Sequence, residues 1–175
     1  MLKRIFIAIN FNSDTRSRLL SLRDGIRSNS KRGSFTQPNN IHLTLIFIGE
    51  SSEAQISLVK AAMDKISFKQ FTITMDRTGY FKRGSGSLWW AGVQENDELS
   101  ALHHDLASRL VSVGFSIEGR RYSPHITLGR DVICNNGPQS TEPFSETVSS
   151  IELMISERIN EKLKYTAIHT KRAEP

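Results

Sequence analysis

The sequence predicts an α+β fold made of two similar lobes, and two observations carry this prediction. The order strand, helix, histidine-bearing strand occurs twice along the 175 residues. The same His-x-Thr-Leu pattern stands in both histidine-bearing strands, at residues 42–45 and 125–128, about half the chain apart. An internal duplication of this kind indicates two lobes related by an approximate two-fold axis, each supplying one histidine-bearing strand to a shared cleft.

The first predicted unit begins with a strand at KRIFIAIN (3–10). A helix follows at SDTRSRLLSLRDGIRS (13–28), with Ser13 as its N-cap and leucines and isoleucine along one stripe. A turn in SFTQPNN (34–40) then leads into the histidine-bearing strand IHLTLIFIGE (41–50).

A second helix is predicted after Ser52, because Ser52 and Gln55 form the capping-box pattern and apolar residues follow at helical spacing. The alternation of FTITM (71–75) predicts a strand. A basic, glycine-containing loop, KRGSGS (82–87), then connects to another strand at LWWAGV (88–93).

The third helix is predicted from about Asp97, with leucines on its inner face. Three strands close the chain, at PHITLGR (124–130), IELMISERI (151–159) and KYTAIHTK (164–171). The first of these strands carries the second His-x-Thr-Leu pattern.

The composition predicts a soluble cytoplasmic protein. The longest apolar run, residues 41–48, is interrupted by His42 and Thr44 and is too short to cross a bilayer, and no signal-peptide series opens the chain. The single cysteine, Cys134, excludes an internal disulfide, and its loop-like stretch DVICNNGP carries no nucleophile motif. The net charge of +5 favours an anionic partner, such as nucleic acid or a phosphorylated small molecule.

Each of the two patterns presents one imidazole beside one hydroxyl. Side chains at i and i+2 of a strand share a face, so His42 is aimed with Thr44 and His125 with Thr127, while the intervening apolar residues point into the core. Five histidines and eleven threonines predict well under one His-x-Thr spacing by chance, whereas two occur. The recurrence favours a functional role over two unrelated structural histidines.

The two pairs together indicate a site for a phosphate ester. Two imidazoles across a cleft can act as an acid and base couple near neutral pH, and two threonine hydroxyls can donate to the nonbridging phosphate oxygens. A metal site is the rival interpretation, because histidine is a common metal ligand. Hard or borderline cations would also require carboxylates, and none accompanies either motif, so we expect no metal and no other cofactor.

The segments HLTL and HITL, the latter within PHITLGR, resemble the paired His-x-Thr-x motifs of the two-histidine (2H) phosphoesterases. The closest branch is the bacterial and archaeal RNA 2′,3′-cyclic phosphodiesterases, formerly called 2′-5′ RNA ligases, and the likeness covers nearly the whole chain. It implies one bilobal domain over residues 1–175, with antiparallel sheets facing a central groove and helices outside. It also implies metal-independent hydrolysis of RNA or oligonucleotide 2′,3′-cyclic phosphate ends to 2′-phosphomonoesters.

The resemblance also implies roles for individual residues. His42 is expected to be the general acid to the 3′ oxygen and His125 the base to water. Phe47 and Arg130 are expected to hold the terminal base by stacking and cation–π contact. On an ideally alternating strand Phe47 faces away from His42, so this role requires either a bulge between them or a position at the strand's end. The lead FTQPNN departs from the aromatic or Val-Pro element of many relatives.

Two other functions stay open at this level. The same cleft can serve a binding module that captures a nucleotide or RNA end with little turnover. It can also serve a related hydrolase of 2′-5′-linked oligonucleotides or of an ADP-ribose cyclic phosphate. In each case the partner is an RNA end or a nucleotide, with no membrane, and we expect a monomer.

Several further residues are interpreted mainly as structural or as solvated charge. Three basic pairs in loops could follow RNA phosphates or simply add surface charge: Lys31 and Arg32, Lys82 and Arg83, and Arg120 and Arg121. Of the adjacent tryptophans, one must face the core and the other the opposite side, where it could offer a stacking surface. The remaining histidines, which lack a threonine partner, are His103, His104 and His169.

Overall fold

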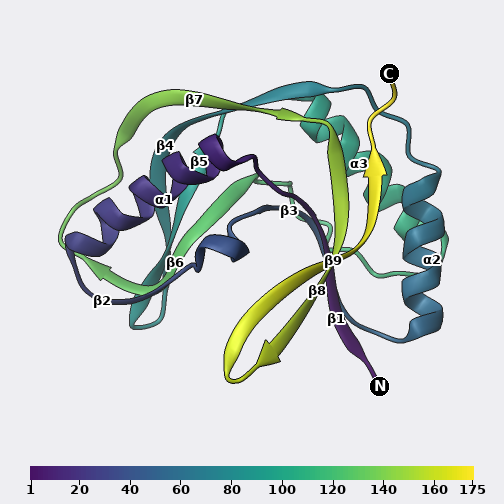
Figure 1. The fold of residues 1–175 in the computed structure, drawn as a ribbon, viewed down its shortest axis with the longest axis horizontal. Coiled ribbons are helices and arrows are strands. Elements are labelled where there is room, and N and C mark those ends of the chain that lie inside the picture. Colours follow the sequence, from purple (N-terminus) through teal and green to yellow (C-terminus); the bar gives the residue numbers. More distant parts are fainter.

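The computed structural model describes residues 1–175 and has two antiparallel sheets and three α-helices (Figure 1). The first sheet has the strand order β3 (Leu43–Ser51), β1 (Lys3–Ile9), β8 (Ser150–Ile159), β9 (Lys162–Arg172). The second sheet has the order β2 (Ser30–Phe35), β6 (His125–Cys134), β5 (Gly86–Val93), β4 (Phe71–Arg83), β7 (Ser140–Val148). The helices are α1 (Ser13–Ser28), α2 (Glu53–Asp64) and α3 (Asp97–Ser112), with a short 3₁₀ turn, η1, at Pro38–Asn40.

The predicted duplication is visible in the connections. The first unit is β1-α1-β3 and the second is β5-α3-β6, and in each the opening strand pairs antiparallel with the histidine-bearing strand. In each unit the helix also crosses to the other sheet: α1 packs on β6, β2 and β7, whereas α3 packs on β3 beside α2. Figure 1 shows α1 over one lobe and α2 with α3 over the other. The α+β, bilobal prediction is confirmed.

Both crossing helices begin with an asparagine N-cap. Asn12 and Asn96 each lie three residues after the end of the preceding strand, and each side chain accepts a hydrogen bond from the backbone N–H three residues on. Such caps satisfy an N–H group that has no partner within the helix. The prediction of Ser13 as N-cap was therefore wrong by one residue, because the amide of Asn12 supplies the acceptor. The capping box of Ser52 and Gln55 is confirmed.

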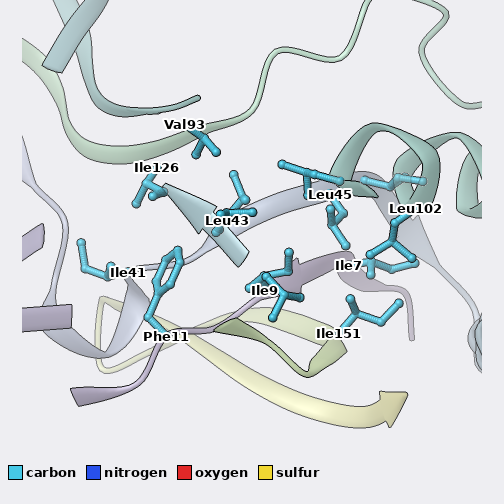
Figure 2. Close-up of a cluster of buried hydrophobic side chains, with 14 of the residues drawn as sticks. Ile7, Ile9, Phe11, Ile41, Leu43, Leu45, Val93, Leu102, Ile126 and Ile151 are labelled. Atoms are coloured by element: carbon cyan, nitrogen blue, oxygen red, sulfur yellow. The ribbon is translucent and has the colours of Figure 1, made fainter. Parts of the chain in front are cut away.

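One cluster of buried apolar side chains draws on both sheets and all three helices. In Figure 2, Ile126 of β6 and Val93 of β5 lie near Leu43 of β3, so the two lobes share their core. The apolar stripes predicted for the helices point into this cluster, with Leu22 of α1 only half-buried at its edge. The faces of both sheets that point away from the helices lie outside this cluster.

Four features differ from the prediction. Strands β2 and β7 were not predicted, because both are largely polar edge strands without an apolar run. The basic loop expected at 82–87 is mostly strand, since β4 and β5 form a hairpin whose turn is only Gly84 and Ser85. Cys134 ends β6 and does not lie in a loop. No helix of the structure has both the length and the apolar character required to span a bilayer.

Truncating the shared core should destabilise the fold much more than an equal change at the surface of the same helix. Leu102 of α3 is 4% exposed, and Leu102→Ala should lower the free energy of unfolding by about 2–5 kcal/mol. Val111, on the exposed face of α3, is the control, and Val111→Ala should change it by less than about 0.5 kcal/mol. Urea unfolding measures both, and equal losses would contradict this description of the core.

Candidate active site

The first motif places its imidazole at the entry to the edge strand β3. His42 follows the 3₁₀ turn and precedes β3 by one residue. Its Nδ1 lies 2.7 Å from the backbone oxygen of Asn40, and its Nε2 lies 2.9 Å from Oγ1 of Thr44. Leu43 is fully buried on the other side. The expected alternation of a core-facing leucine between a His and a Thr on the opposite face is confirmed.

The second motif repeats this arrangement at the start of β6. Nδ1 of His125 lies 2.8 Å from the backbone oxygen of Ser123, again the carbonyl two residues earlier. A carbonyl oxygen can only accept, so Nδ1 carries the proton in both rings. The neutral form of each imidazole therefore has its lone pair on Nε2. At His42 this nitrogen faces the hydroxyl of Thr44.

A bulge in β3 brings Phe47 to the face that carries Thr44. Thr44 pairs with Ala8 of β1 and Ile46 with Ile7, so Leu45 is an extra residue without a partner. Leu45 and Ile46 both enter the core, and the alternation is shifted by one beyond them. Phe47 then pairs with Phe6, which lies on the same face of β1 as Ala8. Of the two conditions for a role of Phe47, a bulge or the strand's end, the structure shows the bulge.

A bulge at the equivalent position of β6 does the same for Arg130. Thr127 pairs with Trp90 of β5 and Gly129 with Trp89, which leaves Leu128 as the extra residue. Leu128 is buried and Trp89 belongs to the core, so Thr127 and Trp90 share the opposite face. Beyond the bulge, Arg130 returns to that face, whereas simple alternation would have turned it away. Phe47 and Arg130 thus occupy matching positions, five residues after their histidines.

The charge of Arg130 acts on groups of both sheets. The pKa of His42 is lowered mainly by burial and further by the positive charges of Arg130 and His125, although the bond to the Asn40 carbonyl opposes this. The pKa of His125 is likewise lowered by burial first and then by Arg130. Burial raises the pKa of Tyr165, and Arg130 counteracts it. Arg130 of β6 therefore lies within electrostatic reach of both motif imidazoles and of Tyr165 on the other sheet.

Aromatic rings that were not predicted as site residues pack around each imidazole. The ring centroid of Phe6 lies 4.9 Å from that of His42, and the ring of Tyr165 meets His42 edge-on at 5.2 Å. On the other sheet, Phe81 meets His125 edge-on at 5.2 Å. Phe6 stands in a continuous apolar run, and Tyr165 comes from a distant strand, so neither gave a local signal in the sequence.

The two tryptophans and the basic residues lie in different parts of the structure. Trp89 is in the core, while Trp90 lies on the motif face against Phe81, with its ring directly over Gly79 where a side chain would collide with it. The guanidinium of Arg4, another residue without a sequence signal, lies 4.9 Å from the centre of the exposed Phe47 ring. Of the three basic pairs, Arg83 lowers the pKa of His125 through its charge.

The other histidines have structural contacts. His103 of α3 stacks on the ring of Tyr122, His169 pairs with Asp64 at 2.7 Å, and His104 is exposed. No group of three or more His, Cys, Asp or Glu side chains converges in a way that could hold a metal ion.

Solved structures with the same architecture define the class of protein. A crystal structure described as a phosphoesterase superposes over the full length of both chains with a TM-score of 0.89 at 25% identity. Escherichia coli LigT, crystallised with 3′-AMP, superposes over the full length of both chains with a TM-score of 0.88 at 24% identity. The fold is therefore that of the LigT-like phosphoesterases.

Sequence comparison identifies the family. The family model of LigT-like phosphoesterases matches residues 9–90, which include the first motif. A Thermotoga maritima protein named RNA 2′,3′-cyclic phosphodiesterase is 34% identical over 130 residues, 73% of this chain and 69% of the relative. The chain belongs to this family of two-histidine phosphoesterases and is an enzyme of the phosphodiesterase class. The resemblance seen in the paired motifs is confirmed.

Removing the charge of Arg130 should raise the pKa of both motif imidazoles. The positive charge disfavours a second positive charge nearby, so Arg130→Met should make protonation of His42 and His125 easier. NMR titration of the imidazole signals measures the effect, and Arg120→Met, at an exposed loop position, is the control. Unchanged pKa values in Arg130→Met would show that this guanidinium does not reach the two rings.

Proposed function

We propose that the chain hydrolyses the 2′,3′-cyclic phosphate end of an RNA or oligonucleotide to a 2′-phosphomonoester by acid and base catalysis from two histidines. The observation that carries the proposal is the pair of His-Thr motifs, each with Nδ1 held by a carbonyl and Nε2 left for proton transfer. The names of the relatives, RNA 2′,3′-cyclic phosphodiesterases, supply the substrate.

In the proposed reaction His125 is the base. Its neutral Nε2 takes a proton from a water molecule as the water oxygen bonds to phosphorus. His42, protonated on Nε2, gives its proton to the 3′ oxygen as the bond from phosphorus to that oxygen breaks. The product keeps its phosphate on the 2′ oxygen, and solvent returns the proton from His125 to His42. These steps need two side chains and one water, and no metal takes part in them.

The binding groups of the proposal stabilise the charge that grows on the phosphate. Thr44 and Thr127 donate hydroxyl hydrogen bonds to its nonbridging oxygens, one from each sheet. Arg130 adds a positive charge and, with Phe47, holds the terminal base between a cation and an aromatic ring. In the resting state Thr44 donates to Nε2 of His42, so phosphate and imidazole compete for one hydroxyl.

The resting protonation states fit a site that is completed by its substrate. Burial and Arg130 lower the pKa of both imidazoles, so both are neutral near pH 7 before substrate binds. A bound phosphate diester brings a negative charge beside them, which raises the pKa of His42 and favours the acid form. Because the pKa of His125 is lowered, its imidazole is neutral and can accept a proton from water.

We further propose that the protein acts as a single-domain monomer in the cytoplasm. Because both sheets share one core and each supplies one motif, residues 1–175 act as a single domain with a complete site, and a monomer suffices. An RNA substrate and a single free cysteine are in keeping with the cytoplasm.

Loss of either motif histidine should abolish most turnover while the fold is kept. Removal of one acid or base costs about 10²–10⁴ in rate, so His42→Ala and His125→Ala should lose activity on that scale. The assay uses a short RNA with a 2′,3′-cyclic phosphate end, with EDTA present, and identifies the position of the product phosphate. His104→Ala, at an exposed position on α3, is the matched control.

Three outcomes would contradict the proposal in different ways. Near-full activity in either variant would exclude the histidine couple. An inactive wild type that still binds the same RNA tightly would point to the binding module. Neither turnover nor binding would point to another phosphoester as the substrate.

The pH dependence of kcat/KM should be bell-shaped. The rising limb reports deprotonation of the base, and the falling limb reports loss of the proton from the acid, in the free enzyme. Because both pKa values are lowered, the maximum should lie below the ordinary imidazole pKa of about 6.5. A rate that rises to a plateau above pH 8 would show that no protonated histidine is needed.

A further inference from the structure

A hydroxyl from the segment before the second motif reaches the first motif. Tyr122 lies three residues before His125, and its phenol donates a hydrogen bond of 2.9 Å to the backbone oxygen of Thr44. Thr44 stands on β3, an edge strand, so this carbonyl has no strand on its outer side. Tyr122 therefore links the backbone carbonyl of Thr44, in the first motif, to the segment that leads into the second motif.

A second hydroxyl makes the reverse connection. Thr36 lies six residues before His42, and its Oγ1 donates a hydrogen bond of 2.9 Å to the backbone oxygen of Thr127. The backbone N–H of Thr36 also donates to the oxygen of Leu128, the bulged residue of the second motif. In both directions the acceptor is the carbonyl of the motif threonine, and the donor comes from the lead of the other motif.

Both donors are themselves held in place. The ring of Tyr122 stacks on His103 of α3 with centroids 4.1 Å apart and planes 4° apart, and α3 packs on β3. Burial raises the pKa of Tyr122 far above its ordinary value, so the phenol keeps its proton and remains a donor. Thr36 directly continues β2, which pairs with β6. Neither donor has a recorded contact with the imidazole of His42 or His125, so any effect on chemistry must pass through the motif backbones.

We propose that Thr36 and Tyr122 are positioning residues, a reciprocal pair of hydroxyl clamps that sets the separation of the two His-Thr pairs across the site. The proposal rests on the proposed function, because a fixed separation matters only if both histidines act on one phosphate. A displacement of about 1 Å in such a site can lower the rate about 10²-fold. Phe47 of β3 and Arg130 of β6 also come from opposite sheets, so binding of the base between them depends on the same separation.

The test removes each hydroxyl with little change of shape, in Tyr122→Phe and Thr36→Val. Tyr80→Phe and Thr141→Val are matched controls: Tyr80 packs on Trp89 without a hydrogen bond, and the buried Oγ1 of Thr141 has no partner. We expect kcat on the cyclic-phosphate RNA to fall about 10- to 100-fold in each clamp variant. Thr36→Ser, which keeps the hydroxyl, should restore kcat.

A second measurement does not depend on turnover. The charges of His125 and Arg130, which belong to β6, lower the pKa of His42, so a wider separation should raise that pKa in both clamp variants and in neither control. NMR titration of the free protein measures it, and circular dichroism and thermal unfolding monitor the fold. A purely structural role would lower the unfolding midpoint without moving this pKa.

The possible results separate the clamps from the function on which they rest. An inactive wild type would refute the proposed function, and the titration would still decide on the clamps. An active wild type with unchanged kcat and an unchanged His42 pKa in both variants would overturn the clamps alone. A raised KM with unchanged kcat would also overturn them. The double variant Thr36→Val and Tyr122→Phe tests whether the two hydroxyls set one shared separation. A fold-decrease in kcat smaller than the product of the two single fold-decreases would support it.

Discussion

The hydrogen bond between each motif imidazole and the carbonyl two residues before it is the interaction on which the rest of the site depends. It places the proton on Nδ1 and leaves Nε2 as the nitrogen that can accept a proton, at His42 and His125 alike. The carbonyl belongs to the same chain segment as the ring, so the orientation is set locally. The fold then has only to bring two such segments together, and no carboxylate partner is required to hold either ring.

Duplication accounts for both the symmetry and the asymmetry of the site. The two units share strand pairing, helix crossing, asparagine caps and a bulge at the residue after the motif threonine. Because the bulges match, the side chains five residues after each histidine reach the same space, and there the units differ: one carries Phe47 and the other Arg130. In the proposed reaction the two His-Thr pairs approach one phosphate in the same way, whereas the terminal base is proposed to lie between these two unlike groups.

Much of this arrangement follows from the sequence, and the exceptions have physical reasons. The two motifs, their aim away from the core and the three helices follow from local periodicity, because alternation and helical spacing are local properties. The orientation of Arg130 depends on a bulge that only strand pairing reveals. Tyr165 and Phe6 join the site through β9 and β1, which are distant in sequence from either motif. The edge strands β2 and β7 are composed mainly of polar residues and so gave no continuous apolar signal.

The most direct test of the account follows the oxygen that enters the product. Wild-type protein would hydrolyse an RNA 2′,3′-cyclic phosphate in heavy-oxygen water with EDTA present, and mass spectrometry with phosphate mapping would locate the label. The account predicts one labelled oxygen in a phosphate that remains on the 2′ oxygen, because water attacks phosphorus and the 3′ oxygen leaves. A labelled 3′-phosphate would contradict the assigned direction of cleavage, and an unlabelled product would contradict attack by water.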